Sequence, residues 1–221
     1  MRLTGELLAQ AMGARVAAGD PGQSIADVSI DSRTIRAGDL FFAIRGARFD
    51  GHRFVTAALA AGAGGLVVSD VAAFDPDRPS AGVLVLVVDD TTRALQALAR
   101  WVRRGSGARV VAITGSAGKT TTKEVTAEFL SARYRVFRNR GNLNNHIGLP
   151  LSLLELRHRP EVAVVELGMN HPGEIRQLVT IAEPDVRVWT NVGDAHLGFF
   201  PSPAAIAEAK AEILEQAGAS D

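Results

Sequence analysis

The sequence predicts an α/β protein in which a small N-terminal α/β domain precedes a second domain built on a parallel sheet. Short apolar runs alternate with helical patterns along the chain of 221 residues, and this alternation is typical of parallel strands joined by right-handed crossover helices. The stretch 110–122, VVAITGSAGKTTT, has the strand, glycine turn and helix start of a phosphate-binding loop. A Gly-Ser-Gly segment at 105–107 interrupts a helical pattern, so we expect one domain over 1–106 and the other over 107–221.

Composition argues against several classes of protein. Hydrophobic residues make up 47% of the chain, which is typical of a globular protein with a core. Lys plus Arg and Asp plus Glu both number 24, and this zero net charge argues against a general nucleic-acid or membrane binder. Because cysteine is absent, we expect neither disulfides nor thiolate chemistry. The start of the chain lacks the apolar core of a signal peptide, and the longest clean apolar run, 83–88, is too short to span a bilayer, so we expect a cytoplasmic location.

The N-terminal domain is predicted to contain short elements, because its apolar residues recur at helical spacing or in short β-forming runs. The expected helices are 3–12, 52–61 and 91–104, and the expected strands are 28–30, 40–44, 65–69 and 83–88. In the first helix, Leu3, Leu7, Leu8 and Ala11 would share one side. Polar residues between 30 and 40 surround an expected turn at Ala37 and Gly38.

The second domain shows the alternation of strand and helix most clearly. The expected strands are 110–114, 134–137, 162–167 and 186–190, and the expected helices are 119–130, 150–156, 174–182 and 203–217. The run 162–167 is continuously apolar up to Glu166, as in a strand that is buried on both faces. Ligands of such sheets bind at the carboxyl ends of the strands. The polar groups that follow strands, Lys119, Glu166 and residues 191–196, are therefore the candidate site.

The phosphate-binding loop has a clear chemical reading. Gly115 and Gly118 allow backbone conformations in which successive N–H groups converge on phosphate oxygens at a helix N-terminus. Lys119 would add a positive charge at the β- and γ-phosphates, and Thr120 would offer a hydroxyl to Mg²⁺. Ile113 stands where the longer G-x-x-x-x-G-K-[ST] pattern has a glycine, so the motif is the shorter T-G-x-x-G-K-T. The alternative is a plain glycine turn with an exposed lysine.

Two further groups of residues have competing interpretations. Glu166 is an ionisable residue in an apolar run, where a carboxylate is costly unless it binds a metal or pairs in a salt bridge. His196 follows the next strand and could bind a second divalent ion or be a satisfied surface histidine. Asn142, Asn144 and Asn145 cluster after a strand, where amides can contact a ligand or simply form turns.

The chain resembles the Mur ligases of bacterial cell-wall synthesis. The resemblance rests on DSRTIRAGDLFFAIRGARFDGHRF, TGSAGKTTTKE, GNLNNHIGLP and ELGMNHPGEI, with weaker support from NVGDAHLGFF and AEAKAEI. The shortened phosphate-binding loop is the form that this family uses. Within the family, GNLNNHIGLP and ELGMNHPGEI favour the member that adds D-alanyl-D-alanine. Gly198 and Phe199 depart from the family pattern, which has an acidic residue and a glycine there.

The resemblance implies an ATP-dependent amide ligase with one or two Mg²⁺ ions. It would join D-alanyl-D-alanine to a UDP-N-acetylmuramoyl tripeptide through an acyl phosphate. The implied nucleotide-binding residues are Thr114, Gly115, Ser116, Ala117, Gly118, Lys119, Thr120, Thr121 and Asn145. The implied substrate-binding residues are Ser32, Arg33, Phe42, Arg45, Gly46, Asp50, Gly51, His52, Asn142 and Asn144.

The resemblance also implies features of the whole protein. Family members are roughly twice as long and have a third, C-terminal domain, so we expect the ATP-binding domain to be incomplete here. We therefore also expect this chain to be inactive alone. A monomer without nucleic-acid partners or membrane insertion is the expected form. Another step of the same pathway, another small-molecule kinase with a phosphate-binding loop, or a non-catalytic UDP-sugar-binding module are the alternatives.

Lys210 is an unusual residue in the last predicted helix. Ile206, Lys210, Ile213, Leu214 and Ala217 fall on one helical face that should be buried. The lysine could extend its ammonium group to water, or burial could lower its pKa and leave a neutral amine that takes up CO₂. Lys210 matches the family position at which a carbamate forms. The resemblance thus implies Lys119, Glu166, His196 and Lys210 as catalytic residues and Thr120, Glu166, His196 and Lys210 as metal ligands.

Overall fold

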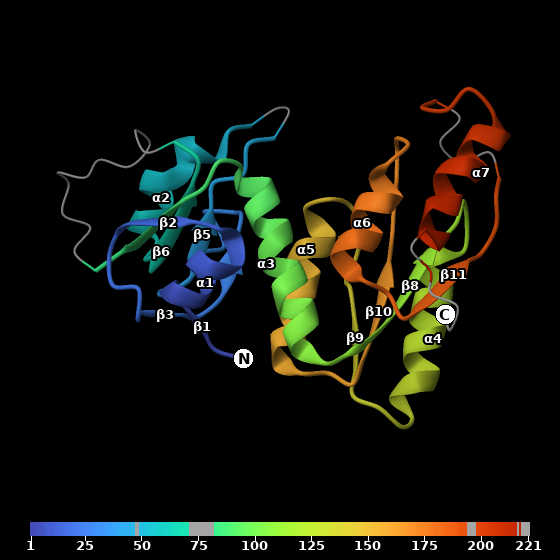
Figure 1. Ribbon diagram of the computed structural model, residues 1–221, viewed down its shortest axis with the longest axis horizontal. Helices are drawn as coiled ribbons and strands as arrows, with labels where there is room; N and C mark the ends of the chain where they lie inside the picture. The colour runs from blue at the N-terminus through green and yellow to red at the C-terminus, as the bar shows by residue number, and fades with distance from the viewer. Residues whose placement is uncertain (47–48, 71–81, 194–197, 216, 218–221) are drawn as a thin grey trace. The chain divides into compact units, whose positions relative to one another are not determined.

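The computed structural model separates into two units, Met1–Leu98 and Ala99–Asp221, which are described in turn. It describes residues 1–46, 49–70, 82–193, 198–215 and 217 (Figure 1). Helix α3 (Thr91–Ser106) contributes residues to both units, because the division falls within it. The expected domain boundary at 106/107 lies at the end of this helix and remains a prediction. None of the helices in these ranges is long and apolar enough to cross a membrane.

The first unit is built on a mixed five-stranded sheet with the order β2-β7-β6-β5-β4. Its strands are β2 (Arg15–Ala18), β4 (Val28–Ser29), β5 (Leu40–Phe42), β6 (Gly65–Val68) and β7 (Leu84–Val87). Strands β4, β5, β6 and β7 are parallel, whereas β2 pairs antiparallel with β7. A separate antiparallel pair joins β1 (Leu3–Thr4) to β3 (Ser24–Ile25). The helices are α1 (Gly5–Met12), the 3₁₀ turn η1 (Gly51–Phe54) and α2 (Val55–Ala60).

The sequence analysis did not predict three of these strands. Strands β1 and β3 have two residues each, which is too short for an alternating pattern to be seen. Strand β2, Arg-Val-Ala-Ala, lies at the sheet edge and has no fully buried residue. The helix expected from Leu3 instead begins at Gly5, because Leu3 and Thr4 extend as β1 and the Thr4 side chain accepts a hydrogen bond from the Leu7 amide.

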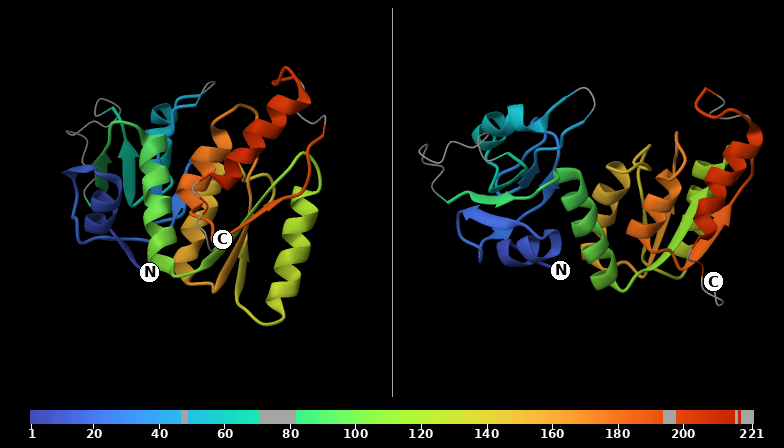
Figure 2. Two further views of the ribbon diagram at one scale, coloured as in Figure 1. Left: turned by 45° about the vertical axis from the view of Figure 1, so that its right-hand side comes forward. Right: turned by 45° about the horizontal axis from the view of Figure 1, so that its top comes forward.

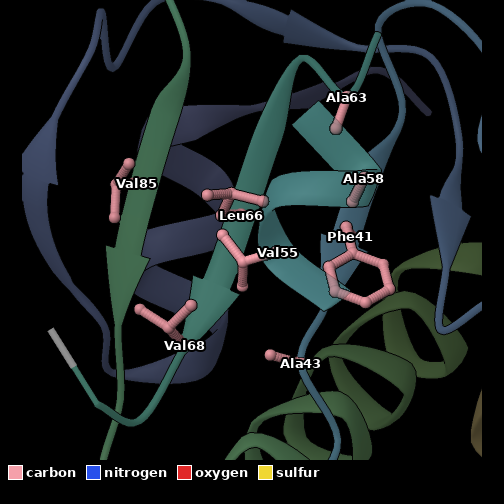
Figure 3. Close-up of a cluster of buried hydrophobic side chains, with 8 residues drawn as sticks. All are labelled: Phe41, Ala43, Val55, Ala58, Ala63, Leu66, Val68 and Val85. Atoms are coloured by element: carbon pink, nitrogen blue, oxygen red, sulfur yellow. The ribbon is translucent and has the colours of Figure 1, made fainter. Parts of the chain in front are cut away.

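The core of the first unit lies between its sheet and α2 (Figure 3). Phe41 and Ala43 of the β5 segment, Leu66 and Val68 of β6 and Val85 of β7 face Val55 and Ala58 of α2, with Ala63 at the edge. All eight side chains are buried. This packing holds the carboxyl ends of β4 and β5 side by side, where two polar loops begin.

The second unit is a fully parallel four-stranded sheet with the order β11-β8-β10-β9. The strands are β8 (Arg109–Thr114), β9 (Val136–Arg138), β10 (Val162–Glu166) and β11 (Val186–Trp189). The helices are α4 (Lys119–Ser131), α5 (Gly148–Leu153), α6 (Glu174–Ala182) and α7 (Pro203–Ala211), with 3₁₀ turns η3 (Leu154–His158) and η4 (Glu212–Leu214). Right-handed crossovers place α4 on one face of the sheet and α5 and α6 on the other (Figure 2).

The predicted elements of this unit are present, with shifts at their ends. Helix α6 matches its prediction, whereas β9 begins two residues later than expected and α5 begins at Gly148. The helix predicted over 203–217 ends at Ala211, where the chain tightens into η4. Leu214 is therefore 51% exposed and Ala217 is exposed as well, so the predicted buried face was wrong at these two positions.

Candidate functional site

The phosphate-binding loop connects β8 to α4, and two glycines give it its shape. Gly115 has φ of +151° and Gly118 has φ of +78°, both in the region that residues with a Cβ rarely adopt. A Cβ at Gly115 would lie 1.9 Å from the Thr190 hydroxyl, so the loop passes directly against the end of β11. Lys119 begins α4 and its Nζ donates to the Gly115 carbonyl over 2.8 Å.

Thr190 and Asn191 hold this loop in place, and the sequence analysis assigned them no such role. The Asn191 carbonyl accepts the Ser116 amide at 3.1 Å, and its side-chain oxygen accepts the Ala117 amide at 3.0 Å. The Thr190 hydroxyl donates to the Ala117 carbonyl at 2.7 Å. The available signal was position alone, because these polar residues follow a strand of the parallel sheet.

Glu166 lies at the centre of the site, at the carboxyl end of β10. Its side chain is 4% exposed. One carboxylate oxygen accepts a hydrogen bond from the Thr120 hydroxyl at 2.7 Å. The other accepts one from the side-chain amide of Asn144 at 2.8 Å. The structure thus joins three residues that the sequence analysis had placed in the site, one from each of α4, β10 and the loop after β9.

The loop after β9 is ordered by its own amides. Asn145 accepts the amides of Ile147 and Gly148 at 3.1 and 2.8 Å and so caps the start of α5. The Asn142 carbonyl accepts the Asn144 amide at 2.8 Å. Asn144 therefore reaches Glu166, whereas the Asn145 oxygen is used within the turn. The turn interpretation therefore applies to Asn145, whereas contact of Asn142 and Asn144 with a ligand stays a prediction.

A cavity of about 360 Å³ brings the predicted residues together. Its lining consists of Lys119, Asn142, Asn144, Asn145, His146, Glu166, Gly168, Met169, Asn170 and Glu174. Gly168 allows the close approach, because a Cβ there would lie 2.8 Å from the Asn144 side chain. The cavity combines a cation, two carboxylates and several amides, which is a suitable environment for a phosphate group and its metal.

Lys210 is buried in α7, with 1% of its surface exposed. Burial, with a smaller contribution from the charge of Lys119, lowers the pKa of its amine from 10.5 to about 8. Of the buried face predicted for this helix, Ile206, Lys210 and Ile213 are indeed buried. His196, the other predicted ligand, lies outside the described residues.

The residues around Glu166 fit a magnesium ion. The carboxylate is buried, and its oxygen lies 2.7 Å from the Thr120 hydroxyl at the first turn of α4. Both are oxygen donors, and Mg²⁺ commonly keeps one or two protein ligands beside water and phosphate oxygens. The described ranges contain no cluster of three or more His, Cys, Asp or Glu side chains able to hold a metal by themselves. The arrangement therefore suits a metal that arrives with a nucleotide.

Most predicted substrate residues of the first unit lie in the two segments that follow β4 and β5, whereas Phe42 is the last residue of β5. Arg33 is 85% exposed and pairs with Asp31 at 2.6 Å. Its hydrogen bonds lower the pKa of Asp31 to about 2. Ser32 lies in the same turn and is half-buried. Since β4 and β5 are parallel neighbours, both loops lie at the carboxyl edge of the sheet, where ligands of α/β proteins bind.

In the second loop, Asp50 is the organising residue. It accepts the His52 amide at 3.0 Å, the His52 Nδ1–H at 2.6 Å and the Arg45 Nε–H at 3.1 Å. These bonds, led by that of the His52 amide, lower the pKa of Asp50 to about 2. The buried His52 ring also accepts the Ser69 amide at Nε2 over 2.9 Å, so both of its nitrogens are used within the protein.

The remaining predicted residues of this loop differ in accessibility. Phe42 is fully buried in β5 and contributes to the core, so its side chain is not accessible to a ligand in this structure. Gly51 is needed for close packing, because a Cβ would lie 2.6 Å from the Ile44 nitrogen. Arg45 and Gly46 are exposed and remain available to a ligand.

Together, the parallel sheet, the glycine loop and the Thr120–Glu166 pair define a nucleotide-binding protein of the phosphate-loop class. The chain matches the model of the Mur ligase middle domain over residues 113–221 and that of the Mur ligase family, catalytic domain, over residues 24–103. The chain belongs to the Mur ligase family.

Similar proteins are found among both sequences and solved structures. The chain is 44% identical to UDP-N-acetylmuramoyl-tripeptide–D-alanyl-D-alanine ligase of Bacillus subtilis and 46% identical to that of Escherichia coli, in each case over 85% of this chain and 40% of the relative. It superposes on MurF from Acinetobacter baumannii with a TM-score of 0.90 at 39% identity, over 99% of this chain and 47% of that one. MurF from Thermotoga maritima, solved with ADP, gives 0.75 at 38% identity, over 86% and 43%. The chain thus spans less than half the length of these relatives.

Proposed function

We propose that this chain forms the nucleotide-binding and UDP-substrate-binding parts of an ATP-dependent ligase. The reaction would join D-alanyl-D-alanine to a UDP-N-acetylmuramoyl tripeptide in peptidoglycan precursor synthesis. The observation that carries the proposal is the Thr120–Glu166–Asn144 cluster, in which Glu166 and Asn144 line one cavity with Lys119 of the phosphate-binding loop. The choice of substrates is supported by the names of relatives that are 44–46% identical.

The proposed chemistry is phosphoryl transfer followed by amide formation. The γ-phosphoryl group of ATP passes to the terminal carboxylate of the tripeptide, and the amine of the dipeptide then displaces phosphate from the acyl phosphate. Mg²⁺, when bound, would neutralise charge on the β- and γ-phosphates. Lys119 and the first amides of α4 bind and orient the phosphates. Glu166 and Thr120 would hold the metal, while Asn144 orients the Glu166 carboxylate.

Lys210 belongs to the same proposal as a metal ligand, together with His196, the other ligand predicted from the resemblance. The neutral Lys210 amine would attack CO₂ and lose a proton, which converts a cation into a carbamate anion with two oxygen donors. Its burial and the lowered pKa of its amine, about 8, favour the reactive form. In an active ligase that contains this sequence, we expect Lys210→Ala to lose most ligase activity and to regain part of it when acetate or another short carboxylate is added. Full activity of Lys210→Ala without additive would contradict the carbamate.

The first unit is proposed to bind the uridine diphosphate part of the substrate. Ser32, Arg33, Arg45 and Gly46 would contact it from the two loops at the carboxyl edge of the β4–β5 pair. Asp50, Gly51 and His52 would support that surface from within. We also propose that the protein is a monomer with small-molecule substrates. We place it in the cytoplasm, because the proposed reaction requires both ATP and a nucleotide-linked substrate.

Calorimetry on this chain tests both parts. ADP should bind more tightly with Mg²⁺ than without it, and Glu166→Gln should remove that difference, whereas Glu161→Gln, at a half-exposed position away from the cavity, should retain it. UDP-N-acetylmuramoyl tripeptide should bind the parent, and it should bind Arg33→Ala more weakly. Arg93 is also an exposed arginine, so Arg93→Ala is the matched control and should bind as the parent does.

The outcomes separate the proposed ligase from its competitors. Absence of a Mg²⁺ effect in the parent would contradict the nucleotide site, and absence of heat with the tripeptide would contradict the substrate site. In an active ligase that contains this sequence, phosphate release should require both the tripeptide and the dipeptide. Phosphoryl transfer to another acceptor without amide formation would instead identify a small-molecule kinase.

A further inference from the structure

Lys123 is a fully buried charged residue that the proposed reaction does not use. It lies on α4, one helical turn after Lys119, and only 1% of its surface is exposed. Its Nζ donates to the Asn139 carbonyl at 2.6 Å and lies 3.1 Å from the Glu124 carboxylate. A buried ammonium group is costly unless its donors are satisfied, so a lysine here requires an explanation in terms of what it holds.

Asn139, the residue that Lys123 contacts, follows β9 and is itself 1% exposed. Its side-chain oxygen accepts the Glu166 amide at 3.0 Å. Its side-chain amide donates to the Leu143 carbonyl at 2.9 Å, one residue before Asn144. Asn139 therefore fixes the backbone on both sides of the Asn144–Glu166 hydrogen bond.

These contacts form a continuous path from α4 to the carboxylate. Lys123 holds the Asn139 backbone, and the Asn139 side chain holds the Glu166 backbone and the loop that carries Asn144. Thr120 and Asn144 then orient the two Glu166 oxygens directly. Partners that orient a metal ligand in this way commonly change metal affinity about 10- to 100-fold when they are removed.

We propose that Lys123 is a positioning residue, which acts through Asn139 to hold Glu166 and the 139–144 loop in the geometry that receives Mg²⁺ with the nucleotide. The proposal rests on the proposed function in one respect, namely that Glu166 is a metal ligand. It assigns the buried ammonium group to the preorganisation of the site. Within the part of the chain that the structure describes, the ammonium group of Lys123 donates to Asn139, which is not among the residues that line the cavity.

The primary experiment measures how much Mg²⁺ tightens ADP binding, as the ratio of the dissociation constants without and with the metal. Lys123→Met preserves the length of the side chain and removes the donor. We expect the ratio to fall about tenfold, in line with other partners of metal ligands, while binding of metal-free ADP stays close to that of the parent. A general loss of folded protein would weaken both measurements equally and leave the ratio unchanged. Glu124→Gln, which removes the negative charge beside the ammonium group, is the matched control and should leave the ratio unchanged.

A second readout is local hydrogen exchange. In Lys123→Met the Glu166 amide, which donates to Asn139, should exchange faster, while the buried Val164 in the same strand should not change. A third test pairs Lys123→Met with Asn139→Ser. If the effect passes through Asn139, the double variant should lose no more of the ratio than the more affected single variant.

Each result supports or overturns the inference. A parent-like ratio in Lys123→Met, or additive losses in the double variant, would show that Lys123 does not position Glu166. If Lys123→Met does not fold, Asn139→Ser decides the same point. A parent-like ratio in that variant would show that Asn139, the middle of the path, does not transmit the effect. If the parent chain itself shows no Mg²⁺ effect, the proposed function fails and the inference falls with it. A Mg²⁺ effect that survives in Lys123→Met overturns only the inference.

Discussion

The phosphate-binding loop depends on single residues that have no substitute. Gly115 combines a φ of +151° with contact to Thr190, and Gly118 adopts a left-handed conformation at the start of α4. Thr190 and Asn191 occupy the space that a side chain at Gly115 would need. The residues that we propose to bind phosphate are therefore held in place by the residues that shape the loop.

We predict that Gly115→Ala disables the loop. The new Cβ would meet the Thr190 hydroxyl at 1.9 Å in a strained backbone conformation, so the loop must move. Strain of this kind costs about 1–3 kcal/mol, and ADP affinity should fall by more than about tenfold, which is the equivalent of 1.4 kcal/mol. Gly107→Ala is the control, because Gly107 has φ of +72° but open space around it. Similar losses of ADP affinity in both variants, measured by calorimetry, would contradict the explanation.

A second prediction at the residue scale concerns acid stability through Asp50. The pKa of this carboxyl is lowered from 3.8 to about 2, mainly by the amide and ring of His52. A lowered pKa in the folded state adds stability above the unfolded value, and that contribution disappears as pH falls from about 4 towards 2. The urea midpoint of the parent should therefore exceed that of Asp50→Asn near neutral pH, with the gap narrowing over this window. A gap that is independent of pH would contradict the assignment.

At the scale of elements, the end of α7 is connected to the start of α6 by one buried carboxylate. Glu212 of η4 is 5% exposed and accepts the amides of Gly173 at 2.7 Å and Arg176 at 3.0 Å. Amides in the first turn of a helix have no acceptor within the helix itself, so Glu212 supplies one for α6. The helix dipole also favours a negative charge at this end. The neighbouring Arg176–Glu215 pair is more exposed. In it, a guanidinium nitrogen of Arg176 lies 2.8 Å from a carboxylate oxygen of Glu215.

We predict that Glu212→Ala destabilises the chain more than Glu215→Ala does. Two partly buried amides would lose their acceptor, which costs about 1–3 kcal/mol, whereas an exposed ion pair contributes less than about 1 kcal/mol. Urea unfolding followed by circular dichroism measures both. If the two variants unfold at the same urea concentration, Glu212 does not have the capping role described above.

Sequence patterns predicted the larger elements well and the smallest ones poorly. The parallel sheet followed from its alternating pattern, and β10 followed from its continuous apolar run. Strands β1, β2 and β3 were missed, because two to four residues at an edge carry no clear period. Position relative to regular elements was enough to predict four residues of the candidate site, because each follows or begins such an element: Lys119, Thr120, Glu166 and Asn144. Asn139 and Lys123 were not, because their importance arises from hydrogen bonds across elements that no local pattern encodes.

At the scale of the whole molecule, the chain has two units with separate sheets and separate candidate sites. The phosphate-binding loop, Glu166 and Lys210 all lie in the second unit, whereas Arg33, Asp50 and His52 lie in the first. Each site is formed at the carboxyl edge of its own parallel strands. The proposed ligase therefore assigns the nucleotide and the UDP-linked substrate to different units.

Hydrogen exchange on the intact chain tests that division. Mg²⁺ with ADP should protect amides in 114–122, 139–148 and 166–170, because a ligand reduces local opening where it binds. UDP-N-acetylmuramoyl tripeptide should protect residues in 31–33, 45–46 and 49–52. Protection by ADP confined to the first unit would contradict the assignment of the sites.

Trp189 gives this protein an optical property of its own. Its indole Nε1–H donates to the Asn191 carbonyl at 3.1 Å, and the same oxygen accepts the Ser116 amide of the phosphate-binding loop. The chain has two tryptophans, so in Trp101→Phe all tryptophan emission comes from a ring one hydrogen bond away from the loop. A loop that turns its Ser116 amide towards a phosphate would leave the indole as the remaining donor to that oxygen. The intrinsic fluorescence of the unlabelled chain then becomes a direct signal of loop occupancy, fast enough to follow arrival and departure of a nucleotide in real time.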